Sequence, residues 1–210
     1  MLVRDVMTYN VVTVPSTMPV LEAERLLEAH QFERLPVVDK GKLVGLVTKD
    51  NLLKASPSPA TSLSRGELLY LLSKLTVKEI MKKNVITVRP TTTIEQATGI
   101  AQENRVGCLV VVEEERVVGI LTTNDIFYKV VNPLFGIGEK GKRIIVYGVE
   151  EVEQVQEVFD CVKKAGFKIK GFWQPMGAEK KDLILHIEAE EIGRLISQLK
   201  RDGFSVEQRN

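Results

Sequence analysis

The sequence contains an internal repeat that covers about half of the chain. Residues 3–54 align with residues 77–128 at a constant offset of 74 positions, and no gap is needed. The identical pairs include Met7/Met81, Asn10/Asn84, Leu35/Leu109, Val37/Val111, Gly45/Gly119 and Thr48/Thr122. A copy this short would leave an apolar face exposed on its own, so we expect the two copies to pack on each other.

Composition and charge exclude several classes of partner. The 210 residues carry 29 basic against 28 acidic side chains, so the sequence has no electrostatic footprint for nucleic acid. Cys108 and Cys161 lie in apolar or helical patterns, which indicates buried thiols in a reducing compartment and no metal site. The first residues lack the apolar core of a signal peptide, and no apolar run approaches the roughly 18 to 20 residues that cross a bilayer. We therefore expect a soluble cytoplasmic protein without nucleic-acid or membrane partners.

Each copy predicts the order strand, helix, strand, strand, helix. In copy one, a β-branched run at Val11–Val14 ends at a proline, and a helix follows from Pro19 with its apolar residues on one stripe. Two strands at residues 35–38 and 43–47, joined by a tight turn, precede a helix that starts at Thr48. The second copy repeats this order, with strands at residues 85–88, 109–112 and 117–121 and helices at residues 94–103 and from Thr122.

Two stretches rich in breaker residues divide the chain. A Pro/Ser segment at residues 56–62 precedes a helix signal from Ser64 to Leu75, and we interpret residues 56–76 as linker and helix. A proline and three glycines interrupt regular structure at residues 132–141, which we interpret as a hinge. The predicted domains are therefore copy one at residues 1–55, copy two at residues 77–131 and a C-terminal domain at residues 142–210.

The C-terminal pattern differs from that of the repeats. It predicts strand, helix, strand, strand, helix and strand at residues 143–147, 151–164, 167–173, 182–188, 190–201 and 204–207. The order βαββαβ is typical of the ferredoxin-like fold, in which an antiparallel sheet carries two helices on one face. The sequence thus predicts an α+β protein with two βαββα repeats followed by a ferredoxin-like βαββαβ domain.

Three short motifs recur in the repeats. The copies open with an acidic residue, an aliphatic residue and Met at Asp5–Met7 and Glu79–Met81, copy one carries the run Leu35–Asp39, and both copies end on Gly-x-x-Thr-x-x-Asp or Asn. These motifs resemble those of CBS domains, of which a tandem pair, a Bateman module, binds adenine nucleotides in the clefts between the copies. The C-terminal part is similar to ACT domains in element order. The whole arrangement resembles the acetoin-utilisation (AcuB-type) proteins of bacteria.

The Gly-x-x-Thr-x-x-Asp ending places polar groups at the start of a helix. Thr122 and Asp125 lie where free N–H groups and the helix dipole favour a phosphate, and the carboxylate can accept two hydroxyl protons. Copy one has Asn51 at the matched position, so it lacks a charge-assisted hold on a ribose diol. The pattern is also that of an ordinary helix N-terminus with Thr as its cap. Its repetition in register favours a ligand, with a stronger site at Asp125 and a weak or empty one at Asn51.

The resemblance to CBS domains implies roles for individual residues. The aspartate holds the ribose, the threonine lies near phosphate, and the first strand of the other copy grips the adenine with apolar side chains and backbone. Carried over by position, one cleft consists of Thr122, Asp125, Asn10, Val12 and Val106. The pseudo-symmetric cleft consists of Thr48, Asn51, Asn84, Ile86 and Phe32, with Arg34 available for phosphate.

The resemblance to ACT domains implies an effector site near the loop after the first C-terminal strand and across a subunit interface. In this sequence, the loop at residues 147–150 leads into glutamates, where amino-acid-binding members have a glycine-rich stretch with Asp or Asn. We therefore interpret the C-terminal domain as an oligomerisation or partner module. A two-fold homodimer is the expected assembly.

The resulting hypothesis is a regulatory protein without chemistry of its own. Its ligand would be an adenine nucleotide (AMP, ADP or ATP) or S-adenosylmethionine, which some CBS pairs take, and no cofactor is required. The resemblance to AcuB-type proteins implies a role around acetoin or acetyl-CoA metabolism. A second hypothesis is a dimerisation or partner-interaction module with empty clefts. An enzyme is disfavoured, because the sequence has no nucleophile–base pair, metal cluster or phosphate-binding loop, and His30 and His186 are isolated.

Overall fold

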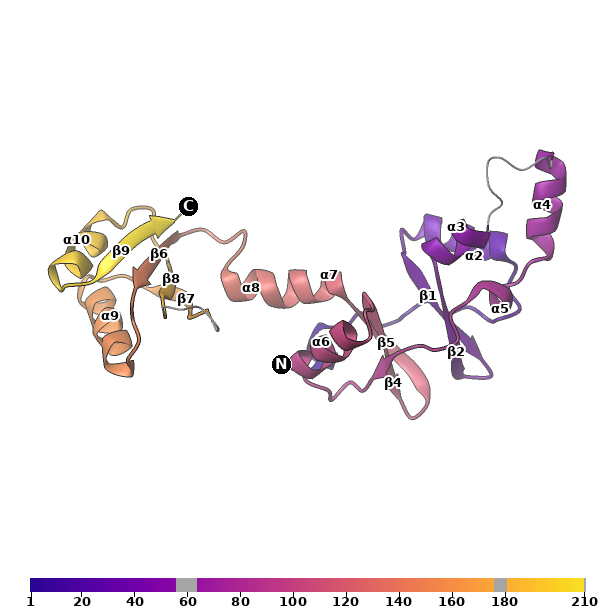
Figure 1. Ribbon diagram of the computed structural model, residues 1–210, viewed down its shortest axis with the longest axis horizontal. Helices are drawn as coiled ribbons and strands as arrows, with labels where there is room; N and C mark the ends of the chain where they lie inside the picture. The colour runs from indigo at the N-terminus through magenta and orange to yellow at the C-terminus, as the bar shows by residue number, and fades with distance from the viewer. Residues whose placement is uncertain (56–63, 176–180, 210) are drawn as a thin grey trace. The chain divides into compact units, whose positions relative to one another are not determined.

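The computed structural model describes residues 1–55, 64–175 and 181–209, and the chain divides into two units (Figure 1). The first unit, Met1–Ile126, contains both copies of the repeat, and the second is Phe127–Asn210. The division precedes the predicted hinge at residues 132–141. The predicted Pro/Ser linker at residues 56–62 lies outside the described residues.

Copy one forms an antiparallel strand pair flanked by helices. Its elements are α1 (Val3–Val6), α2 (Val20–Ala29), β1 (Arg34–Asp39), β2 (Lys42–Thr48) and α3 (Lys49–Ala55). The apolar stripe of α2 is buried, with Val20, Ala23 and Leu27 at most 3% exposed. The strand predicted at Val11–Val14 is wrong in extent, because only its last residue pairs, in parallel with β1. Its first two valines instead line a cleft.

Copy two repeats this arrangement with an added strand. Helix α4 (Arg65–Lys74) precedes it, and its own elements are α5 (Val77–Ile80), β3 (Thr87–Val88), α6 (Ile94–Glu103), β4 (Cys108–Glu113), β5 (Arg116–Thr122) and α7 (Thr123–Ile126). Strand β3 runs parallel to β4, and β4 runs antiparallel to β5. The register shifts between Val111 and Val112, the positions matched to the shift between Val37 and Val38 in copy one. The repeat therefore extends to the irregularities of the sheets.

The first segment of each copy pairs with a strand of the other copy. Thr8 and Ile120 exchange two backbone hydrogen bonds, with N···O distances of 2.9 and 3.0 Å. At the matched positions, Leu46 and Lys82 exchange two bonds of 2.9 Å. The segment after α1 thus pairs with β5 of copy two, and the segment after α5 pairs with β2 of copy one.

Apolar side chains complete the contact between the copies. Leu46 of β2 packs in one buried cluster with Cys108 and Val110 of β4 and Ile120 of β5. The two copies therefore bury their apolar faces on each other, as predicted from their length. Cys108 is only 8% exposed and behaves as the expected buried thiol.

Two matched glycines allow a methionine of the other copy to approach. A Cβ added at Gly45 would lie 2.4 Å from Met81 Sδ and 3.0 Å from the carbonyl oxygen of Lys82. A Cβ added at Gly119 would lie 2.4 Å from Met7 Sδ. Contacts this short are not tolerated, so the motif glycine and the opening methionine of the repeat depend on each other across the copies.

The second unit is a four-stranded sheet with two main helices. After a π-helical turn (η1, Phe127–Val131), its elements are α8 (Asn132–Phe135), β6 (Lys142–Tyr147), α9 (Val152–Lys164), β7 (Ile169–Trp173), β8 (Leu183–Ile187), α10 (Gly193–Arg201) and β9 (Ser205–Arg209). The strand order is β7-β8-β6-β9, and every neighbouring pair is antiparallel. One cluster of buried side chains joins α9 and α10 to β6, β8 and β9.

The predicted break at residues 132–141 begins too early. Helix α8 continues to Phe135 because Pro133 occupies its first turn, where a missing N–H costs nothing, and it ends at Gly136 in the left-handed conformation (φ 61°).

Among the helices of the described residues, none is long and apolar enough to cross a membrane.

We predict that Gly45→Ala lowers the free energy of unfolding by about 1 to 3 kcal/mol, because the added methyl group overpacks the contact with Met81. Urea denaturation would measure the change. Gly99→Ala is the matched control: Gly99 lies in α6 with no atom within 4 Å of an added Cβ. Its substitution should raise stability by about 0.5 to 1 kcal/mol, since alanine favours helix. Equal effects of the two substitutions would contradict the proposed contact.

Candidate functional site

The start of α7 is organised around a buried carboxylate. The Thr122 N–H and Oγ1 donate to Asp125 Oδ2 at 2.9 and 2.6 Å, and the Asp125 N–H donates back to Thr122 Oγ1 at 3.2 Å. Thr8 Oγ1 of the other copy donates to Asp125 Oδ1 at 3.1 Å. Asp125 is 8% exposed, the only carboxylate among the described residues that is buried. The exchange of first segments between copies therefore brings Thr8 onto this group.

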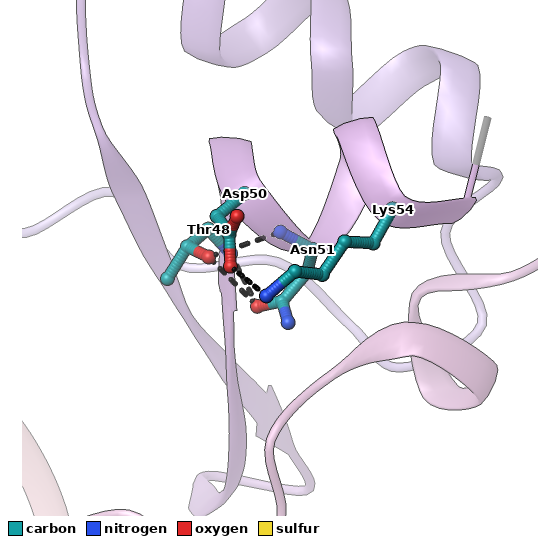
Figure 2. A network of polar contacts seen from close by, with 4 residues as sticks. All are labelled: Thr48, Asp50, Asn51 and Lys54. Carbon is teal, nitrogen blue, oxygen red and sulfur yellow. Dashed lines mark hydrogen bonds and ion pairs between the residues drawn. The ribbon is translucent and has the colours of Figure 1, made fainter. Parts of the chain in front are cut away.

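The start of α3 has the same geometry without the charge (Figure 2). The Thr48 N–H and Oγ1 donate to Asn51 Oδ1 at 3.1 and 2.8 Å, and the Asn51 N–H donates to Thr48 Oγ1 at 3.2 Å. The Asn51 amide oxygen thus accepts the same two bonds from its threonine as the Asp125 carboxylate oxygen does. Asp50, the neighbouring carboxylate, binds Lys54 at 2.7 Å. The cap alone therefore does not require an aspartate at position 125.

A cleft of about 500 Å³ lies over Asp125, and we name it the Asp125 cleft. Four of the residues predicted for this cleft line it: Asn10, Val12, Thr122 and Asp125. Copy one supplies the segment from Thr8 to Val12 and the loop from Gln31 to Arg34, and copy two supplies the start of α7. Val11, Val12, Phe32 and Ile120 make much of its wall apolar.

The pseudo-symmetric cleft, which we name the Thr48 cleft, has a volume of about 280 Å³. Its lining includes the predicted residues Thr48, Asn84, Ile86 and Arg34. Asn51 does not line it, although its side chain is bonded to Thr48.

Two of the predicted site residues line the opposite cleft from the one predicted for them. Phe32 lines the Asp125 cleft, and Val106 lines the Thr48 cleft, the reverse of the prediction. The loop that precedes β1 or β4 stays beside the first segment of its own copy and faces the helix start of the other copy. Both loops turn through a left-handed residue, Gln31 at φ 54° and Arg105 at φ 52°. That turn changes the direction of the chain, which the residue pattern alone does not reveal.

Several lining residues were not predicted from the sequence. Thr8 and Gln31 line the Asp125 cleft, and their matched residues, Lys82 and Arg105, line the Thr48 cleft. The constant offset of the repeat could have found each pair once one member was known. Thr8 carried a further signal, because it directly follows the opening methionine of the motif.

Arg34 lies between the two clefts and lines both of them. Its Nε is buried and has no hydrogen-bond partner. The neighbouring Glu33 accepts a hydrogen bond from Lys49 Nζ at 2.8 Å. That bond holds the pKa of Glu33 below its usual value, and the charge of Arg34 contributes to the shift. Within the described residues, no group of three or more His, Cys, Asp or Glu side chains could hold a metal ion.

Comparison with known proteins identifies the first unit. The family model for the CBS domain matches the chain twice, at residues 3–58 and 77–132. The chain therefore belongs to the CBS-domain family and carries a tandem CBS pair within a mixed α+β fold.

Solved structures of CBS pairs resemble this chain. A Vibrio cholerae protein described as an acetoin utilization protein (AcuB) is 29% identical with a TM-score of 0.53, covering 63% of this chain and 91% of its own. The CBS pair of protein MJ0100, in complex with 5′-methylthioadenosine and S-adenosyl-L-methionine, is 30% identical with a TM-score of 0.51, covering 66% and 98%. The protein CBSX2, in complex with AMP, is 28% identical with a TM-score of 0.52, covering 62% and 96%.

The curated relatives share only the CBS region. An L-aspartate semialdehyde sulfurtransferase of Methanocaldococcus jannaschii is 34% identical over 127 residues, which are 60% of this chain and 22% of the enzyme. The chain spans less than half the length of the first four curated relatives that it matches.

We predict that Asp125→Asn and Asp125→Ala differ in stability. The amide oxygen of Asn can keep the bonds from Thr122, as Asn51 does with Thr48, so we expect Asp125→Asn to cost less than about 1 kcal/mol. Asp125→Ala keeps the backbone bond to the capping Thr122 but removes the acceptor of Thr8 and Thr122, which should cost about 1 to 3 kcal/mol. Urea denaturation of both variants tests this, and an equal loss in both would show that the cap is not what Asp125 contributes.

Proposed function

We propose that this protein is a regulatory sensor that binds an adenine nucleotide or a related adenosine ligand in its CBS pair. The observation that carries the proposal is Asp125, a buried carboxylate beneath a largely apolar cleft that both copies build. Solved relatives with the same fold bind AMP, S-adenosyl-L-methionine and 5′-methylthioadenosine, which share an adenosine moiety.

The shape and chemistry of the Asp125 cleft fit that moiety. Its volume of about 500 Å³ falls within the range of small-molecule sites, which is about 300 to 1,000 Å³. Val12, Phe32 and Ile120 offer apolar surface for an adenine ring. A ribose hydroxyl would join or replace Thr8 Oγ1 on Asp125 Oδ1, because a carboxylate oxygen accepts more than one hydrogen bond.

Signalling requires that the ligand favours one arrangement of the molecule over another. The Asp125 cleft is lined by both copies, so bound ligand would contact both and bias how they pack. We propose that the second unit passes this change on as an ACT-like domain. Its βαββαβ order and its antiparallel sheet with order β7-β8-β6-β9 support a ferredoxin-like assignment. The unit would act in a homodimer or on a partner protein.

The likeness to the Vibrio cholerae AcuB protein supports a place in acetoin metabolism. A second candidate function is a dimerisation or partner-interaction module that binds no ligand. It is favoured by the hydrogen bonds that Asp125 already accepts from Thr8 and Thr122, since those bonds satisfy the carboxylate as an ordinary helix cap.

Calorimetric titration of AMP, ADP, ATP and S-adenosylmethionine tests the proposal. We expect saturable binding of at least one of them to wild type, weakened about 10- to 100-fold in Asp125→Asn, because hydrogen bonds to a charged acceptor contribute about 1.5 to 3 kcal/mol. Asn51→Ala is the matched control: it alters the equivalent helix cap, yet Asn51 does not line the Asp125 cleft. Absence of binding and of any thermal shift, in protein first freed of ligand, would favour the non-binding module.

A further inference from the structure

The two clefts differ in charge at matched positions of the repeat. Where the Asp125 cleft has Thr8, Gln31 and Thr123, the Thr48 cleft has the cations Lys82, Arg105 and Lys49. Each pair is separated by the offset of 74 positions that relates the two copies. At these three matched positions, the Thr48 cleft therefore carries cations and the Asp125 cleft carries neutral side chains.

The carboxylates do not offset this difference. Each cleft is lined by two of them, Glu33 and Asp125 in the Asp125 cleft and Glu33 and Asp50 in the Thr48 cleft. The two carboxylates that do line the Thr48 cleft are already paired, Glu33 with Lys49 at 2.8 Å and Asp50 with Lys54 at 2.7 Å (Figure 2). The ion-pair partner of Asp50 is therefore Lys54, a residue that does not line the cleft.

Three cations of the Thr48 cleft keep their charge available. Within residues 1–55, 64–175 and 181–209, neither Arg34, Lys82 nor Arg105 takes part in an ion pair. Arg34 also holds a buried Nε that lacks a hydrogen-bond partner. Gly107, which lines both clefts, lies beside this guanidinium, and a Cβ added there would be 3.7 Å from Arg34 Nη1. Guanidinium and ammonium groups around one hollow are the donors that phosphate oxygens prefer.

We propose that the Thr48 cleft is a binding site for a di- or triphosphate group, while the Asp125 cleft takes the uncharged adenosine part. At about 280 Å³ the Thr48 cleft lies at the lower end of the range for small-molecule sites, and it has room for a short phosphate chain. The clefts adjoin through Glu33, Arg34 and Gly107, which line both. This division of the ligand rests on the proposed function, because the adenosine part must occupy the Asp125 cleft.

The test compares pyrophosphate, adenosine and ADP by calorimetry at several salt concentrations. The variant is the double substitution Lys82→Thr with Arg105→Gln, which places in the Thr48 cleft the residues that the Asp125 cleft has at the same positions. The control removes equal charge outside the cleft lining: Lys83→Thr with Arg89→Gln, two exposed residues that do not line it. We expect wild type to bind pyrophosphate with an affinity that falls as salt rises, and the cleft variant to bind it at least about tenfold more weakly. Adenosine binding should stay unchanged.

The outcomes separate the source of the phosphate and the two proposals. Competition of pyrophosphate with ADP but not with adenosine would support the phosphate chain of a nucleotide seated in the Asp125 cleft. Pyrophosphate bound together with ADP would support a separate anion. If pyrophosphate does not bind, or the control variant loses as much affinity as the cleft variant, the phosphate site is refuted. If pyrophosphate binds as expected but adenosine and ADP do not, the phosphate site stands and the proposed sensor function falls.

Discussion

The structure of the first unit depends on the backbone pairing that exchanges the opening segments of the two copies. Four hydrogen bonds join Thr8 to Ile120 and Lys82 to Leu46, and they place residues of both copies around each cleft. The same pairing brings Thr8 within hydrogen-bond distance of Asp125. The exchange therefore places residues of both copies beside each helix start.

The two copies share buried core residues and differ in several of the residues that line their clefts. Leu35 and Val37 recur as Leu109 and Val111, and all four are at most 1% exposed, because a packed interior tolerates little change of volume. Side chains that line the clefts face open space on one side, so their charge can change without a loss of packing. The pair Thr8 and Lys82 illustrates this, since both residues form the same backbone bonds while their side chains differ in charge. A comparison of the copies thus separates what the fold requires from what a ligand could select.

The parts of the structure that could be predicted are those that local pattern determines. The helices and most strands follow from periodicity. Thr122, Asp125, Asn10 and Val12 line one cleft, as the resemblance to CBS domains implied. Two errors have a tertiary origin. The run Val11–Val14 has strong strand propensity. Only Val14 pairs with a residue of β1, while Val11 and Val12 line a cleft, so a strand does not form. Phe32 was assigned to the wrong cleft, because a left-handed turn directs its loop.

The contrast between Asp125 and Asn51 indicates what a carboxylate contributes at this position. Both side chains accept the same bonds from a preceding threonine, so helix capping is satisfied by an amide oxygen. The second oxygen of Asp125 also accepts a hydrogen bond from Thr8 of the other copy. The two helix starts therefore share their local geometry and differ in the charge that the Asp125 carboxylate places at its cleft.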